Sequence, residues 1–87
     1  MSVTAVNVPE RSRFEVEQGG ETAVLVYERG EGEVALVHTV VPASMEGQGV
    51  GSVLARTALA WAHDEGLRVD PVCSFVKSYL ERHPDEA

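Results

Sequence analysis

The sequence has little of what metal sites, membrane proteins and nucleic-acid-binding proteins require. Its single cysteine, Cys73, has no partner for an internal disulfide, and its three histidines show no zinc-ligand spacing. No apolar run approaches the ~20 residues of a membrane helix, and the first residues lack the basic and apolar regions of a secretory signal. Basic residues number seven against fourteen acidic ones, so no surface for phosphate backbones is expected. We therefore expect a cytoplasmic protein that has no metal site and that binds neither membrane nor nucleic acid.

What is present fits one globular domain, spanning residues 1–87. With 44% hydrophobic and 24% charged residues, the chain is near the globular average, and its 87 residues are too few for a second core. The net charge is -7, and residues 1–46 alone hold eight acidic and three basic residues, a balance of -5. This half would attract a cationic partner. The alternative is that the acidic surface only keeps the protein soluble.

The first half of the chain has the period of β-strands. Apolar and polar residues alternate around Phe14 and Val16, while Thr22–Tyr27 is apolar on both faces and is expected to be more central. Val34–Val41 is the longest run rich in β-formers, and Pro42 ends its regular pairing. The turns between the strands are Gln18-Gly19-Gly20-Glu21 and Gly30-Glu31-Gly32. These short connections predict an antiparallel meander.

The period changes to that of helices after Pro42. One helical stripe of about four turns is formed by Val50, Val53, Leu54, Thr57, Ala58, Trp61 and Ala62. Gly66 ends this helix, a short strand follows at 67–70, and it returns parallel to the 34–41 strand by a right-handed crossover. A second helix has the stripe Val72, Phe75, Val76, Tyr79 and Leu80 and stops at Pro84. The fold class is therefore α/β (α+β), a mixed sheet in the order β-β-β-α-β-α.

Three alternate glycines, Gly47, Gly49 and Gly51, lie between the longest strand and the first helix. Glycines at a helix start let an anion reach the unpaired N–H groups, and the helix dipole favours negative charge there. The alternative is that they only make a tight connection between strand and helix.

The glycine run differs from two known nucleotide-binding loops. No lysine follows it, as one does in a nucleotide-binding P-loop. Its spacing is G-x-G-x-G rather than the spacing of dinucleotide-binding sites, although Asp70 lies where such a site has its ribose-binding acid.

Three segments carry a resemblance to a known family. They are His38-Thr39-Val40-Val41-Pro42, the glycine run Gly47–Gly51, and Pro71–Val76 continued to Arg82-His83-Pro84. In this order and spacing they resemble the small stand-alone members of the GNAT superfamily of acetyl-CoA-dependent N-acetyltransferases, over about Phe14 to Pro84. The resemblance implies a GNAT-like sheet in which the strands at 34–41 and 67–70 splay apart.

The resemblance also implies a cofactor, acetyl-CoA, and the backbone that holds it. The CoA diphosphate would be bound by the amides of the glycine loop, here Gln48, Gly49, Val50, Gly51 and Ser52. The pantetheine arm would pair with the backbone of the preceding strand, here including Thr39, Val40 and Val41.

The sequence departs from the usual pattern of the superfamily at two points. Glu46 replaces the usual Gln or Arg and should repel a diphosphate, and the strand and helices that commonly precede the sheet and build the acceptor pocket are missing.

Three side chains are candidates for the chemistry of acetyl transfer. Cys73 enters the last helix, whose dipole favours thiolate, and it would act as an acyl carrier or a proton donor. Tyr79 matches the tyrosine that many superfamily members use as an acid. His38 is expected to share a strand face with Leu36 and Val40 and to act as a base. Each has an alternative role in packing, Cys73 as a small buried residue, Tyr79 in the apolar stripe and His38 as a strand histidine.

The favoured hypothesis is that the chain binds acetyl-CoA and transfers the acetyl group to an amine. The acceptor is not identified, and the acidic N-terminal half favours a cationic one. Two other classes stay open: a non-catalytic module that binds CoA or acyl-CoA, and a small acidic protein-interaction domain that keeps the fold.

Overall fold

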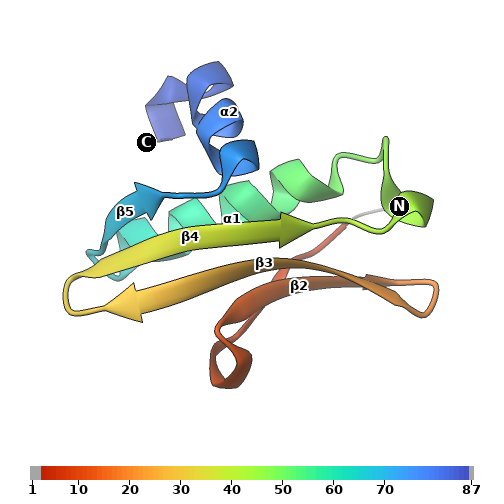
Figure 1. Ribbon diagram of the computed structural model, residues 1–87, viewed down its shortest axis with the longest axis horizontal. Coiled ribbons are helices and arrows are strands. Elements are labelled where there is room, and N and C mark those ends of the chain that lie inside the picture. The colour runs from red at the N-terminus through yellow and green to blue at the C-terminus, as the bar shows by residue number, and fades with distance from the viewer. Residues whose placement is uncertain (1–2, 87) are drawn as a thin grey trace.

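Five strands form one mixed sheet, and two α-helices pack against it (Figure 1). The computed structural model describes residues 3–86. The strands are β1 (Val6–Val8), β2 (Arg13–Gln18), β3 (Glu21–Gly30), β4 (Glu33–Val40) and β5 (Arg68–Pro71). The α-helices are α1 (Val50–Asp64) and α2 (Ser74–Arg82), and short 3-10 helices span Pro9–Arg11, Ala43–Met45 and Pro84–Glu86. The predicted fold class and the order from β2 to α2 are confirmed.

The sheet order β1-β2-β3-β4-β5 follows from tight turns and one crossover. Gly19 and Gly20 join β2 to β3 with φ of 59° and 81°, a left-handed backbone that glycine adopts at little cost. β2, β3 and β4 pair antiparallel, while β4 and β5 pair parallel across α1. The antiparallel meander and the parallel crossover predicted from the sequence are both present.

β1 was not predicted, and its presence corrects the expectation that no strand precedes the sheet. It pairs antiparallel with β2 over Val6↔Glu15 to Val8↔Arg13. Three residues are too few for alternation to be visible in the sequence.

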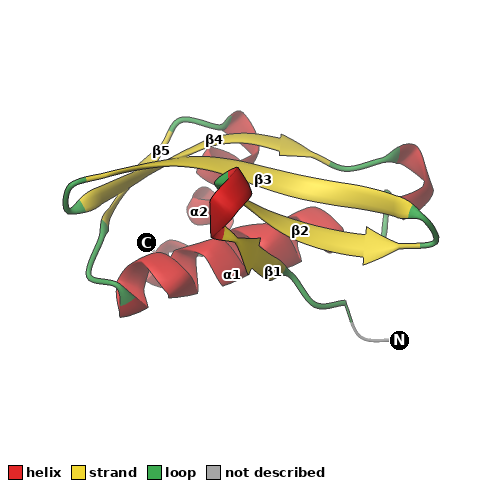
Figure 2. Cartoon of the chain, turned by 90° about the horizontal axis from the view of Figure 1, so that it is seen from below, coloured by secondary structure: helices red, strands yellow, loops and turns green. Residues whose placement is uncertain are grey.

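The hydrophobic core lies between one face of the sheet and the two helices. Phe14, Leu25, Leu36 and Leu54 are each 1% exposed or less. The predicted stripe of α1 is confirmed at Val50, Leu54, Ala58 and Ala62, but its centre is shifted toward Ala55 and Leu59, which are also buried. In Figure 2, α1 runs beneath one side of the sheet. The opposite face of β2, β3 and β4 is covered by no α-helix of residues 3–86, and we refer to it below as the open face.

A β-bulge in β4 decides which side chains face the core. Tyr27 pairs with Leu36, but Val26 pairs with His38, so Val37 is an extra residue in β4. Paired residues share a sheet face, and one inserted residue reverses the alternation that follows it. His38 therefore lies on the open face with Val26, and Thr39 lies on the core side with its partner Leu25. The prediction that His38 shares a face with Leu36 is wrong, and the bulge is the reason.

The second helix begins later than its apolar stripe predicted. Val72 precedes α2 and is 50% exposed, whereas Val76 and Tyr79 are buried as expected. The helix ends at Arg82, two residues before Pro84. Within the described part of the chain, neither helix has the length and apolar character to cross a membrane.

Candidate functional site

The glycine loop adopts a backbone that only glycine accepts readily. Gly47 and Gly49 have φ of 82° and 74°, and a Cβ placed on either would meet no atom within 4 Å. Gly49 is the N-cap of α1 and forms no side-chain cap. Among residues 3–86, the space beside both glycines is therefore open.

Gly51 has a different reason to be glycine. A Cβ at this position would lie 2.7 Å from Cζ of Phe75, on the opposite helix. Gly51 thus allows α1 and α2 to approach closely, so part of the glycine pattern serves packing. This reason differs from the tight connection that the sequence suggested as an alternative, while Gly47 and Gly49 border open space.

The start of α1 offers backbone donors. Helical bonding begins with the amide of Val53, which donates to the carbonyl of Gly49 at 3.1 Å. The preceding helical amides, of Val50, Gly51 and Ser52, have no acceptor within the helix by its geometry. These N–H groups, together with the positive end of the helix dipole, form an anion-binding arrangement.

A hollow of about 250 Å³ lies at this helix start. The predicted residues Val41, Gly49, Val50, Gly51 and Ser52 line it. Glu46, which the sequence analysis expected to repel a diphosphate, lines the hollow as well. Met45, Phe75 and Arg82 also line it, and the sequence analysis did not predict them. Arg82 is the last residue of α2, and its Nε donates to the carbonyl of Ser78 at 3.4 Å. A positive charge near free amides suits a phosphate.

Three of the predicted cofactor-binding residues lie outside this hollow. The side chain of Gln48 hydrogen-bonds to Gln18 at 3.0 Å and to the carbonyl of Ser44 at 3.1 Å. Val40 is 44% exposed and shares the open face with its partner Val24. Thr39 points instead toward Cys73.

β4 and β5 separate where the predicted splay was placed. Their parallel pairing ends at Leu36↔Pro71, and the amide of Cys73 then donates to the carbonyl of Leu36 at 2.8 Å. Among residues 3–86, no strand pairs with β4 on that side from there to Val40 (Figure 1). An edge with unpaired backbone groups can pair with an extended ligand. We refer to this separation as the β4–β5 gap.

Cys73 lies at the β4–β5 gap as the N-cap of α2. Its side chain is 9% exposed, and its Sγ lies 3.4 Å from Oγ1 of Thr39. Burial raises the pKa of the thiol, but the Thr39 hydroxyl and the backbone amides of Val76, Phe75 and Thr39 lower it by more. The net pKa is below the ordinary value, which favours a thiolate.

Tyr79 lies away from Cys73, near the other end of α2. Six residues of helix separate their backbones by roughly 9 Å. The Tyr79 ring is 1% exposed, its hydroxyl donates to Glu86 at 2.7 Å, and its ring lies 4.4 Å from that of His83. Burial, and then the bond to the Glu86 carboxylate, raise the pKa of Tyr79. Tyr79 is therefore packed in the core, and the structure does not bring it to the thiol.

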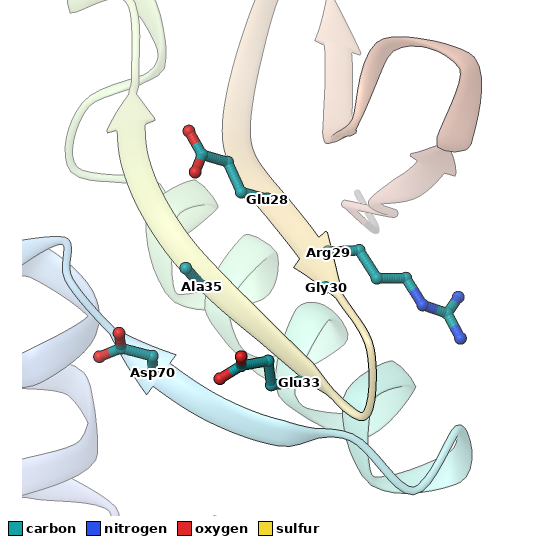
Figure 3. Close-up of a pocket in the computed structure, with 6 residues that line it drawn as sticks. All are labelled: Glu28, Arg29, Gly30, Glu33, Ala35 and Asp70. Carbon is teal, nitrogen blue, oxygen red and sulfur yellow. The ribbon is translucent and has the colours of Figure 1, made fainter.

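The open face carries a second hollow, of about 300 Å³, close to the β4–β5 gap. Figure 3 shows Glu28, Glu33 and Asp70 around Ala35, while the side chain of Arg29 points away from them. Asp70 pairs with Ala35, one residue before strand pairing ends.

The charges around this second hollow are mostly negative. Arg29 is engaged elsewhere, with Glu65 at 3.3 Å and 5.6 Å from the Trp61 ring. Glu33 pairs with Arg68 at 3.2 Å, a largely exposed contact. Sequence reasoning placed acidic charge in the first half of the chain but did not locate this hollow, because Asp70 joins it only through β4–β5 pairing.

The chain was compared with models of protein families and with curated proteins. The family model described as GCN5-related N-acetyl-transferase matches residues 13–87. No curated protein matches the chain. The matched residues include every strand from β2 onward, both α-helices, the glycine loop and Cys73.

Proposed function

The chain belongs to the GCN5-related N-acetyltransferase family, and on this premise we propose that it binds acetyl-CoA and transfers the acetyl group to an amine. The observation that carries the proposal is the placement of two features at neighbouring points of β4. Free amides and Arg82 border a hollow at the start of α1, and a thiol of lowered pKa lies at the β4–β5 gap. The hollow with its amides suits the binding of a diphosphate, and the thiol suits a reaction with a thioester.

The residues at the first hollow fit a CoA diphosphate. The amides of Val50, Gly51 and Ser52 are the proposed donors, and Arg82 supplies a positive charge that balances Glu46. The backbone from Thr39 in β4 to Val41 just after it, beyond the pairing with β5, is the proposed partner of the pantetheine arm. Acetyl-CoA supplies an activated acetyl group, and the chain's residues bind and orient it.

Cys73 is proposed as the acyl carrier. Its thiolate attacks the thioester carbonyl carbon, a bond forms from that carbon to Sγ, and the bond to the CoA sulfur breaks, so that CoA leaves as a thiolate and takes a proton from solvent. A neutral amine then attacks the acetyl carbon on Cys73, and Cys73 leaves as a thiolate while the amine loses its extra proton. A lowered pKa favours this role over that of a proton donor, because the thiol is more often deprotonated.

The acceptor is proposed to bind on the open face. His38 lies on that face, and we propose that it accepts the proton that the amine loses. The carboxylates of Glu28, Glu33 and Asp70 favour a cationic amine, since they border the hollow next to the β4–β5 gap. A diamine or polyamine carries both the reacting amine and a second positive charge.

Binding and turnover test the proposal together. We expect CoA to raise the unfolding temperature more than equal concentrations of ATP or NADH, because only CoA combines a diphosphate with an arm for the edge of β4. We also expect thiol release from acetyl-CoA to exceed background with cationic amines in a panel that includes neutral ones. Binding without thiol release would indicate the non-catalytic CoA module. No stabilisation by CoA would indicate the interaction domain.

The two charged residues at the first hollow should change CoA affinity in opposite directions. Arg82→Gln should weaken CoA binding about fivefold or more, since it removes a charged donor to a phosphate. Glu46→Gln should tighten binding by up to about fivefold, because a repulsion of at most ~1 kcal/mol is removed at an exposed position. Calorimetric titration measures both effects.

Matched controls for these variants are Lys77→Gln and Glu81→Gln, which make the same changes at exposed positions of α2 outside the hollow. They should leave CoA affinity unchanged. Equal effects at the control positions would show that net charge alone acts, and the proposed diphosphate site would be wrong.

A further inference from the structure

The side chain of Thr39 faces the only thiol of the chain, and the two are held by separate parts of the fold. We propose that Thr39 is a positioning residue for Cys73, whose hydroxyl donates a hydrogen bond to the thiolate and holds it at the β4–β5 gap. This inference rests on the proposed function, because it assigns a role in the step that Cys73 carries out.

The bulge at Val37 makes this pairing possible. Without it, the alternation of β4 would turn Thr39 to the open face and His38 toward α2. With it, Thr39 lies opposite Leu25 on the core side, and its Oγ1 lies 3.4 Å from Sγ of Cys73. Because of the bulge, the hydroxyl of Thr39 rather than the imidazole of His38 lies beside the thiol.

Both partners are held in place by the backbone. The amide of Cys73 donates to the carbonyl of Leu36 at 2.8 Å, which ties the start of α2 to β4 three residues before Thr39. Thr39 lies in a paired strand, where its branched side chain has few rotamers. The distance between hydroxyl and sulfur is therefore set by the sheet rather than by two mobile side chains.

The direction of the hydrogen bond follows from the charge of the sulfur. Either atom can donate when the thiol is protonated, but a thiolate has no proton, so the Thr39 hydroxyl must donate to it. Donation stabilises the charged form. The other causes that act on the thiol are burial and backbone amides of Val76, Phe75 and Thr39, and none is a charged side chain among the described residues.

The test compares Thr39→Val, which keeps the shape and removes the hydroxyl, with Thr39→Ser, which keeps the hydroxyl. Thiolate formation is followed by ultraviolet absorbance as pH is raised, with Cys73→Ala as the blank, and the signal is specific because the chain has one cysteine. We expect Thr39→Val to move the titration midpoint upward by about one pH unit, and Thr39→Ser to restore it. No CoA or acceptor is needed.

Turnover of the same variants provides the second readout. Thr39→Val should lower kcat about tenfold near neutral pH with little change in KM for acetyl-CoA, and the loss should shrink as pH rises above the new midpoint. A change that only loosened the fold would not recover with pH.

The outcomes separate the two proposals. An unchanged midpoint in Thr39→Val would overturn this inference even if the protein transfers acetyl groups. An upward shift in a protein that releases no thiol from acetyl-CoA with any amine would overturn the proposed function, and with it the role of Thr39 in transfer.

Discussion

Replacing Cys73 with alanine is expected to lower the turnover of acetyl-CoA at least about tenfold and to leave CoA affinity nearly intact. The side chain lies at the β4–β5 gap, away from the amides and Arg82 that are proposed to hold the diphosphate. Removing the thiol removes the proposed acyl carrier, while the proposed diphosphate site keeps all its groups. The measurement is thiol release under saturating acetyl-CoA, together with the Kd for CoA.

The acyl-carrier mechanism also predicts a covalent product. Wild-type protein incubated with acetyl-CoA alone should gain the mass of one acetyl group, and Cys73→Ala should gain none. Because the chain has one cysteine, the modified residue is identified without further mapping. Full turnover in Cys73→Ala would assign the residue to packing.

The packing alternative makes a different prediction for the same variant. Cys73 is 9% exposed and belongs to the core, so truncation to alanine should cost on the order of 1 kcal/mol of the unfolding free energy. A loss of activity that simply followed this destabilisation would disappear at lower temperature. A catalytic loss would persist in the folded variant.

The sequence predicted the elements whose signal is local. The helical stripe from Val50 to Ala62 and the glycine turns gave α1 and the β2–β3–β4 meander, because periodicity and turn chemistry act over a few residues. The position of Cys73 at the entry to α2 followed from the same local pattern.

Features that depend on pairing or on distant residues were missed. Nothing in the run Val34 to Val41 marks Val37 as an extra residue, since the bulge is defined only against β3. The base candidate His38 was therefore placed on the wrong face, and Thr39 was considered only for its backbone. Arg82 reaches the start of α1 through the packing of α2, a contact that no motif in the sequence encodes.

The family match and the sequence analysis both indicate an N-acetyltransferase, but neither locates a binding site for the acceptor. One face of the sheet is packed against α1, and the open face carries His38 and the hollow lined by Glu28, Glu33 and Asp70. In this arrangement β4 separates the proposed thiol from the proposed base. The β4–β5 gap is then the point at which acetyl donor and amine acceptor would meet.

Substitution of Gly49 by valine should abolish CoA binding, a loss of at least about a hundredfold. The new side chain would project into the space beside the amides of Val50 to Ser52, which is open in the present fold. Losing two charge-assisted hydrogen bonds from these amides costs about 3 kcal/mol or more, which corresponds to a hundredfold in Kd. The measurement is calorimetric titration with CoA.

Gly66→Val is the matched control, because it strains the backbone in the same way but places no side chain at the proposed CoA site. Gly66 lies just beyond the other end of the same helix, with φ of 69° against 74° at Gly49, and a Cβ at either position meets nothing within 4 Å. Both variants should lose roughly 1–2 kcal/mol from a left-handed valine, and their unfolding temperatures should fall by comparable amounts. Only Gly49→Val should lose CoA. If a folded Gly49→Val protein bound CoA as tightly as Gly66→Val, the diphosphate would lie elsewhere, and the amides at the start of α1 would have no part in binding it.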